Sequence, residues 1–226
     1  MPRFLTPGRI AALLLALTMP AAEQAAAHPH MWIDARAWLV FDGDGRLAAL
    51  RQAWRFDEMS SAYSLQGLPR SADGGYAPKA LQSMADDWVA ALGEPQSHYF
   101  TWLRYRGRSL EFGTPAHASV QWDKTAARVT LVFELPLQTP VAPAGAEMQM
   151  EVFDPTYFVA YAFDAPGAIE LDGAPRACRS DYRPPQPLDP ATALRLAAIP
   201  ADAEIPPGEL SALTQKLSHR IGVRCP

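Results

Sequence analysis

Apolar and polar residues alternate along two runs near the start of the chain, 31–41 (MWIDARAWLVF) and 46–57 (RLAALRQAWRFD). This alternation is typical of strands that bury one face. The sequence Asp-Gly-Asp-Gly at 42–45 separates the two runs and favours a tight turn. The pattern therefore predicts an antiparallel hairpin. Pairing Phe41 with Arg46 across the four-residue loop gives its register.

The pattern then changes to a helical period. Residues 58–67 and 77–93 are predicted helices, and in the second one Leu81, Met84, Trp88 and Leu92 recur every three to four residues. A further block of alternating runs follows and predicts strands at 98–106, 108–113, 117–122, 127–135, 147–154 and 157–164.

The last part of the chain has a different texture. Residues 183–190 (RPPQPLDP) form a Pro-rich linker, and 190–199 and 208–220 are predicted helices. The expected fold class is α+β: mainly an antiparallel β-sheet or sandwich, with two inserted helices and a disulfide-tied C-terminal tail.

The N-terminal segment has the pattern of an export signal. Arg3 and Arg9 precede the apolar run 10–17, and small residues follow up to Ala25-Ala26-Ala27. The apolar run is about half as long as a bilayer span requires. We therefore expect residues 1–27 to be a cleaved signal peptide and 28–226 to form a single periplasmic domain with no membrane span after processing.

The chain has two cysteines, Cys178 and Cys225, and both lie in the part expected to be exported. In an oxidising compartment, a lone pair of cysteines is most simply a disulfide.

Composition excludes some classes of function. The 226 residues include 20 Lys and Arg and 24 Asp and Glu, which gives a net charge of −4, so we expect no nucleic-acid partner. The sequence has no G-x-S-x-G, H-E-x-x-H, phosphate-binding loop or G-x-G-x-x-G motif. We therefore expect a protein that is not an enzyme.

The segment His28-Pro29-His30 is the strongest candidate for chemistry. Its two imidazoles point to one side of an extended chain, and Pro29 restricts the backbone around them. Cleavage after Ala27 would add the α-amine of His28. Imidazole and amine nitrogens suit a divalent transition metal such as Zn, Ni, Co or Cu. The alternative is a flexible polar terminus that binds nothing.

Carboxylates could complete this site. The predicted register places His30 opposite Asp57 and Ile33 opposite Trp54, at the separation of directly paired residues. A one-residue bulge would present Glu58 instead. Asp154, in the turn sequence FDPTYF at 153–158, is a possible fourth ligand or simply a turn residue.

Asp34 is too far along the strand to share that metal. We expect it to form a surface ion pair with Arg51 or Arg55 on the same face.

Three stretches resemble a bacterial family of unknown function: HPH-x-W-I-D at 28–34, W-x-F-D-E at 54–58 and F-D-P-T-Y-F at 153–158. Members of that family are described as the periplasmic component, or substrate-binding protein, of an uncharacterised ABC-type transport system. They tend to be encoded beside nickel/cobalt-type permeases. The resemblance implies handling of a divalent metal outside the inner membrane, with an inner-membrane metal permease as partner.

These observations favour an exported, metal-binding accessory or substrate-binding component of a divalent transition-metal transport system. His28 and His30 would be primary ligands, with Asp57, Glu58 or Asp154 as carboxylate ligands. Two alternatives stay open: a copper-dependent enzyme that uses an N-terminal histidine brace, and an interaction module that binds no metal.

Overall fold

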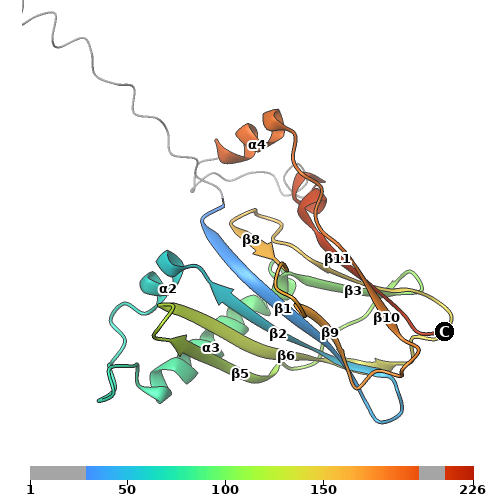
Figure 1. Cartoon of the computed structure of the whole chain (residues 1–226), viewed down its shortest axis with the longest axis horizontal. Helices are drawn as coiled ribbons and strands as arrows, with labels where there is room; N and C mark the ends of the chain where they lie inside the picture. The colour runs from blue at the N-terminus through green and yellow to red at the C-terminus, as the bar shows by residue number, and fades with distance from the viewer. Residues whose placement is uncertain (1–28, 199–211) are drawn as a thin grey trace, which may run out of the picture.

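Two β-sheets and three helices form the part of the protein that the computed structural model describes, residues 29–198 and 212–226 (Figure 1). Most neighbouring strands are antiparallel, and two helices are inserted between the second and third strands. This confirms the α+β class with two inserted helices. The predicted signal peptide, 1–27, and His28 lie outside the described residues.

The six-stranded sheet is built around the predicted hairpin. β1 (Met31–Phe41) pairs with β2 (Leu47–Phe56), and β6 (Arg128–Val141) and β5 (Ala116–Asp123) extend the sheet beyond β2. On its other edge, β1 pairs in parallel with two short strands in succession. These strands are β8 (Val159–Ala162) and β9 (Ile169–Asp172).

The five-stranded sheet is antiparallel in the order β10-β11-β7-β3-β4. Its strands are β10 (Arg179–Arg183), β11 (His219–Arg224), β7 (Met148–Val152), β3 (Thr101–Tyr105) and β4 (Arg108–Ser109).

The helices are α2 (Glu58–Ser64), α3 (Pro78–Leu92) and α4 (Pro190–Ala197). Two short 3-10 turns, η2 (His98–Phe100) and η3 (Gln215–Leu217), precede β3 and β11. α3 lies behind the six-stranded sheet in the view of Figure 1, and it packs against β5. In the described residues, no helix is both long enough and apolar enough to cross a membrane.

A buried polar link joins the inner faces of the two sheets. Gln52 of β2 is fully buried; its side-chain N–H donates to the Thr101 hydroxyl of β3 at 3.0 Å, and its carbonyl accepts from the Trp54 indole at 3.1 Å. Trp54 also packs its ring against Phe133 at 5.0 Å and against Tyr161 at 5.2 Å. Because buried polar groups need partners, this link fixes which residues of the two sheets face each other.

The predicted hairpin is present, but its register is wrong by two residues. Phe41 pairs with Leu47 rather than Arg46, and a bulge beside Val40 adds a further shift, so Ile33 lies opposite Phe56. The turn accounts for the first residue of the shift, because the Asp42 carboxylate accepts from the backbone N–H groups of Asp44 and Arg46 and keeps Arg46 in the loop.

The shift moves Asp57 away from His30. The Asp57 backbone N–H donates to the Trp32 carbonyl at 2.9 Å, so Asp57 lies opposite Trp32. A shift of two residues keeps every side chain on its predicted face, since side chains alternate with period two. Ile33 and Trp54 are therefore both buried as expected.

The predicted helix at 208–220 is wrong at its end. Residues 199–211 lie outside the described part of the chain, and the segment from His219 onward is strand β11, with Ile221 and Val223 buried. β9 and β10 were not predicted, because they are short; β9 exposes two of its four residues and β10 exposes four of its five. The Cys178–Cys225 disulfide is confirmed and ties β11 to the segment before β10.

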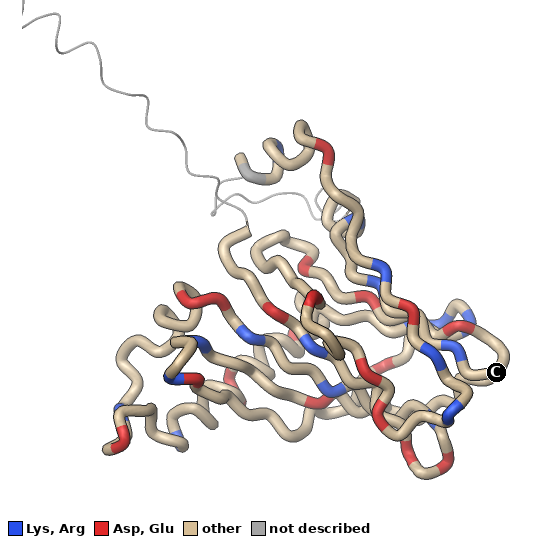
Figure 2. Tube along the Cα trace, in the orientation of Figure 1, with Lys and Arg blue, Asp and Glu red and all other residues tan. Residues whose placement is uncertain are grey.

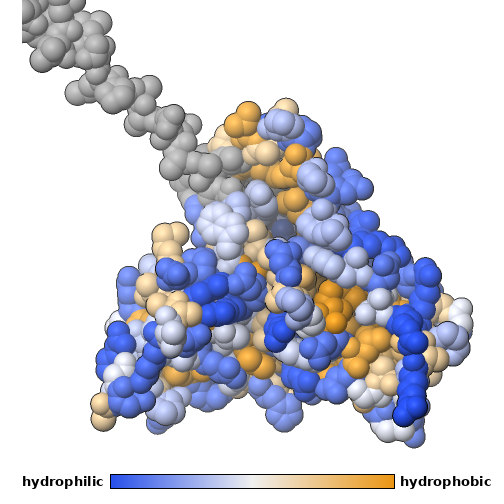
Figure 3. Space-filling model, viewed as in Figure 1, coloured by the Kyte–Doolittle hydropathy of each residue, from blue (hydrophilic) through white to orange (hydrophobic). Residues whose placement is uncertain are grey.

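Charged residues of both signs are interspersed along the strands that face the viewer in Figure 2. The same view is largely hydrophilic over the strands, while hydrophobic residues gather around α4 and between the sheets (Figure 3).

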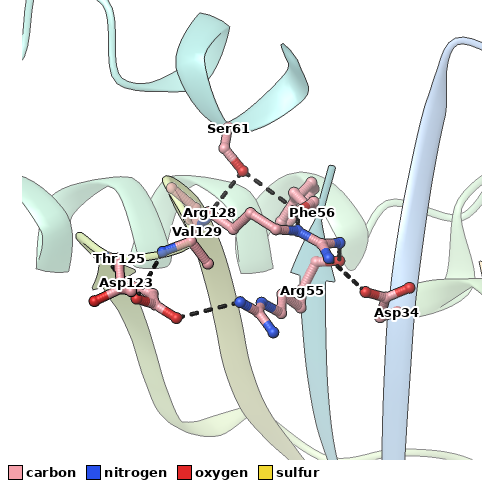
Figure 4. Close-up of polar contacts among 9 residues, drawn as sticks. Asp34, Arg55, Phe56, Ser61, Asp123, Thr125, Arg128 and Val129 are labelled. Atoms are coloured by element: carbon pink, nitrogen blue, oxygen red, sulfur yellow. Dashed lines mark hydrogen bonds and ion pairs between the residues drawn. The ribbon is translucent and has the colours of Figure 1, made fainter. Parts of the chain in front are cut away.

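The ion pair predicted for Asp34 has another partner. Asp34 accepts from Arg128 at 2.6 Å, and Arg55 pairs with Asp123 at 3.2 Å (Figure 4). Arg51 pairs with Asp172 at 2.8 Å. All four carboxylate and guanidinium groups of the first two pairs lie on strands of one sheet. The expectation missed Arg128 because β6 is far from Asp34 in sequence.

Candidate functional site

His30 stands immediately before β1, at the end of the six-stranded sheet where β1 meets β8. Its backbone N–H donates to the Phe158 carbonyl at 2.9 Å, and its ring lies 4.8 Å from the Phe158 ring. The parallel pairing of β1 with β8 continues from this point, beginning with Met31 opposite Val159. The position of His30 is therefore fixed by the segment that carries Asp154.

Asp154 lies two residues after the end of β7 and organises the turn that leads into β8. Its carboxylate accepts from the Thr156 backbone N–H and hydroxyl, both at 2.8 Å, and from the Val159 backbone N–H at 2.9 Å. The residue is 4% exposed. Three donors compensate part of the cost of burying this carboxylate. The turn role expected for Asp154 is confirmed, and the same turn brings it to the wall that His30 lines.

Asp57 is the N-cap of α2. Its carboxylate accepts from the Ser60 backbone N–H at 2.8 Å, the Ser60 hydroxyl at 2.7 Å and the Trp32 backbone N–H at 3.0 Å. Burial raises the pKa of Asp57, but these bonds outweigh burial and hold the pKa below its ordinary value. Glu58 follows in the first, exposed turn of α2. Metal binding by either carboxylate stays a prediction.

A large cavity opens beside His30 and Asp154. It has a volume of about 1120 Å³ and lies on the inner face of the six-stranded sheet. Trp54 and Leu131 of that sheet, 2% and 1% exposed, form its floor. The cavity occupies the part of the inner face that lies between α2, α3 and the turn at 154–158.

One face of α3 lines this cavity. Ala80, Met84, Trp88 and Leu92, each four residues apart, all contact it. Buried Ala85 and Val89 are outside this lining set. The sequence predicted that Met84, Trp88 and Leu92 share an apolar face, but not that this face borders an open space.

The turn before β3 supplies another wall. His98, Tyr99 and Phe100 have φ values of 45°, 54° and 47°, a left-handed conformation that costs energy for residues other than glycine. This turn places Phe100 in the cavity wall, stacked at 6.5 Å from Trp54. The strand predicted from residue 98 accordingly begins at Thr101.

Tyr161 of β8 lies where the apolar floor meets the polar end. It lines the cavity and is 9% exposed, and its hydroxyl has no hydrogen-bond partner among the described residues. Burial, together with the nearby Asp154, raises the pKa of this hydroxyl well above its ordinary value. It therefore stays protonated and can donate a hydrogen bond at neutral pH.

Comparison with known proteins places the chain in a family. Residues 12–225 match the profile of a family described as "Protein of unknown function (DUF1007)". The chain belongs to this family. An uncharacterized protein of Haemophilus influenzae is 21% identical over 153 residues, which cover 68% of this chain and 71% of that protein. Neither match names an activity.

The described residues hold few metal donors close together. Among residues 29–198 and 212–226, no group of three or more His, Cys, Asp and Glu side chains could hold a metal ion. His30 and Asp154 are the two predicted ligands that line one cavity. The predicted ligand His28 lies outside the described residues.

The sequence contained one unused signal for the cavity. Met59 and Tyr63 are apolar residues one turn apart on α2, and they are 69% and 75% exposed. They lie on the cavity rather than in the core. An apolar helix stripe with no buried partner is a sign of a binding surface.

Proposed function

We propose that this protein is an exported metal-binding accessory, or substrate-binding component, of a divalent transition-metal transport system, and that it acts with an inner-membrane metal permease. The observation that carries the proposal is that His30 and Asp154 line the wall of one cavity. His30 also directly follows the His28-Pro29 segment in the sequence. Imidazole and carboxylate groups are ligands for Zn, Ni, Co and Cu.

Asp154 is the best placed of the three candidate carboxylates. A carboxylate has about four lone-pair positions, and the turn uses three of them. The remaining position and the cavity that both residues line favour Asp154 as the ligand that joins His30 and His28. Asp57 accepts from two donors of Ser60 and from the Trp32 backbone N–H, and neither Asp57 nor the exposed Glu58 lines the cavity.

Two features support export to the periplasm. The disulfide between Cys178 and Cys225 is typical of proteins from an oxidising compartment. The N-terminal residues 1–27 have the charge, apolar run and small-residue pattern of a signal peptide. Both fit a protein that meets its metal outside the inner membrane.

Calorimetric titration of the protein, purified from the periplasm without an affinity tag, tests the site. Zn, Ni, Co and Cu are each titrated from pH 5.5 to 7.5. We expect binding that weakens toward the acidic end, since imidazoles protonate near a pKa of about 6.5 and the protonated ring cannot bind metal. The paired substitution His28→Ala and His30→Ala should abolish binding.

His117→Asn is the matched control. It removes an exposed imidazole outside the cavity, at a backbone φ of 53° that Asn tolerates. Equal loss in this control, or unchanged affinity in the double-alanine protein, would contradict the proposed ligands. A copper site that also fails when one residue is added before His28 would instead indicate the histidine brace.

A further inference from the structure

The cavity is far larger and more apolar than a metal ion needs. Its volume of about 1120 Å³ lies just above the range of about 300–1,000 Å³ that is typical of sites for drug-sized organic ligands. Aromatic residues of three different elements line it: Trp54 of β2, Trp88 of α3 and Phe100 of η2. Such a lining suits the apolar part of an organic molecule.

Large apolar side chains are left exposed at this cavity. Met59, Tyr63 and Phe158 line it and are 69%, 75% and 43% exposed. They are three of the five large hydrophobic residues that the described residues expose. Because removal of apolar surface from water is favourable, binding of an apolar molecule that covers these three side chains would be stabilised.

The charges that line the cavity favour a ligand with a positively charged head group. Two carboxylates, Asp154 and Asp87, and one imidazole, His30, line the cavity, while no Lys or Arg of the described residues does. Asp154 is 4% exposed, so its charge acts where solvent screens it weakly. The buried Tyr161 hydroxyl beside it has no hydrogen-bond partner among the described residues. A cationic group is favoured here, and an anionic head is not.

We propose that this cavity binds a small amphipathic cation. Its apolar body lies between α2, α3 and Trp54, and its positively charged head lies at the end formed by Asp154 and Tyr161. The charged head would share Asp154 with the metal site proposed above, but binding of the amphiphile needs neither His28 nor a bound ion.

Displacement of a neutral fluorescent dye, N-phenyl-1-naphthylamine, tests the proposal on the purified protein in the presence of EDTA. Decylammonium and decanoate compete for the dye below their micellar concentrations. The two competitors share one chain and differ in head charge. We expect the concentration of decylammonium that displaces half of the dye to be at least about tenfold lower than that of decanoate. One favourable charge contact supplies a difference of this size.

Two substitutions on α3 distinguish binding in the cavity from binding elsewhere on the surface of the helix. Ser83→Trp places a bulky ring at the cavity, whereas Lys79→Trp places the same ring on an exposed position of α3 outside it. We expect decylammonium binding to weaken about tenfold in the first variant, because overfilling costs that much, and to be unchanged in the second. Asp154→Asn should reduce the preference for decylammonium over decanoate, whatever its effect on absolute affinity.

Equal displacement by decylammonium and decanoate would overturn the proposal, and so would equal weakening by the two tryptophan variants. His30→Ala provides the separation from the metal site. Amphiphile binding that persists in this variant while zinc binding is lost supports two separate functions. Loss of both would show that the amphiphile site depends on the metal ligands, and would overturn the proposal as stated.

Discussion

The sequence around Asp57 is compatible with two different roles for its carboxylate. The predicted register made it a metal ligand beside His30, while the structure makes it the N-cap of α2 and a bridge to β1. Asp57→Ala removes the acceptor for two backbone N–H groups and the Ser60 hydroxyl. We expect it to lower the free energy of unfolding by about 0.5–2 kcal/mol. Urea denaturation at pH 7 measures this.

The same residue predicts a pH dependence. Because the folded protein holds the pKa of Asp57 below its unfolded value of about 3.9, its contribution is fully present above that value. It is lost as the pH falls through the lower, folded pKa. The difference in stability between the native protein and Asp57→Ala should therefore shrink at acidic pH. A difference that stays constant between pH 7 and pH 3 would contradict the charged cap.

For individual residues, the sequence identified candidate site residues but not which of them lie close together. His30 and Asp154 were both candidates, and both line one cavity. The pairing of His30 with Asp57 failed because the Asp42 side chain holds Arg46 in the loop and a bulge beside Val40 adds a second residue of shift. Alternation of apolar residues fixes the face of a strand, yet a shift of two residues leaves every face unchanged.

Among the elements, α2 is tied to β6 by one buried hydroxyl. Ser61 is fully buried; its hydroxyl accepts from the Val129 backbone N–H at 2.9 Å and lies near the Phe56 carbonyl (Figure 4). Ser61→Ala leaves the Val129 N–H without this partner, at a cost of about 1–3 kcal/mol. Thermal unfolding should show this loss. The exposed control Ser83→Ala should change stability by less than about 0.5 kcal/mol.

An undiminished unfolding temperature in Ser61→Ala would mean that another group takes the Val129 N–H. Because α2 carries Met59 and Tyr63, a loosened α2 should also weaken binding of the neutral dye in the cavity.

Elements with one clear period were predictable, and those stabilised by distant partners were not. The α3 stripe and the first hairpin follow from local spacing. β9 pairs in parallel with β1 across more than a hundred residues, and β10 has exposed residues at four of its five positions. Local alternation does not reveal such pairings. The predicted helix ran two residues into β11, and the rest of β11 was missed because six residues offer too little alternation to identify a strand.

For the whole molecule, the disulfide connects the last strand to the rest of the chain. Cys178 and Cys225 are 47 residues apart in sequence, a loop for which the chain-entropy model gives about 4 kcal/mol. Replacing both with serine should lower the free energy of unfolding by an amount of this order. Guanidinium denaturation of the oxidised and the double-serine proteins measures it.

Neither cysteine lines the cavity, so folded double-serine protein should still bind zinc with unchanged affinity. Weakened zinc binding in fully folded double-serine protein would contradict this prediction, because it would show that the metal site depends on the disulfide.

A crystal of the protein soaked with Zn²⁺ and measured at the zinc absorption edge would locate the ion without any substitution. We predict an anomalous peak at the polar end of the cavity, about 2.0–2.1 Å from a ring nitrogen of His30, a usual Zn–N distance. His28 should supply the second nitrogen and Asp154 the oxygen. A peak at the Asp57 cap, a peak elsewhere on the surface, or a cavity without zinc at saturating concentration would contradict the proposed metal site.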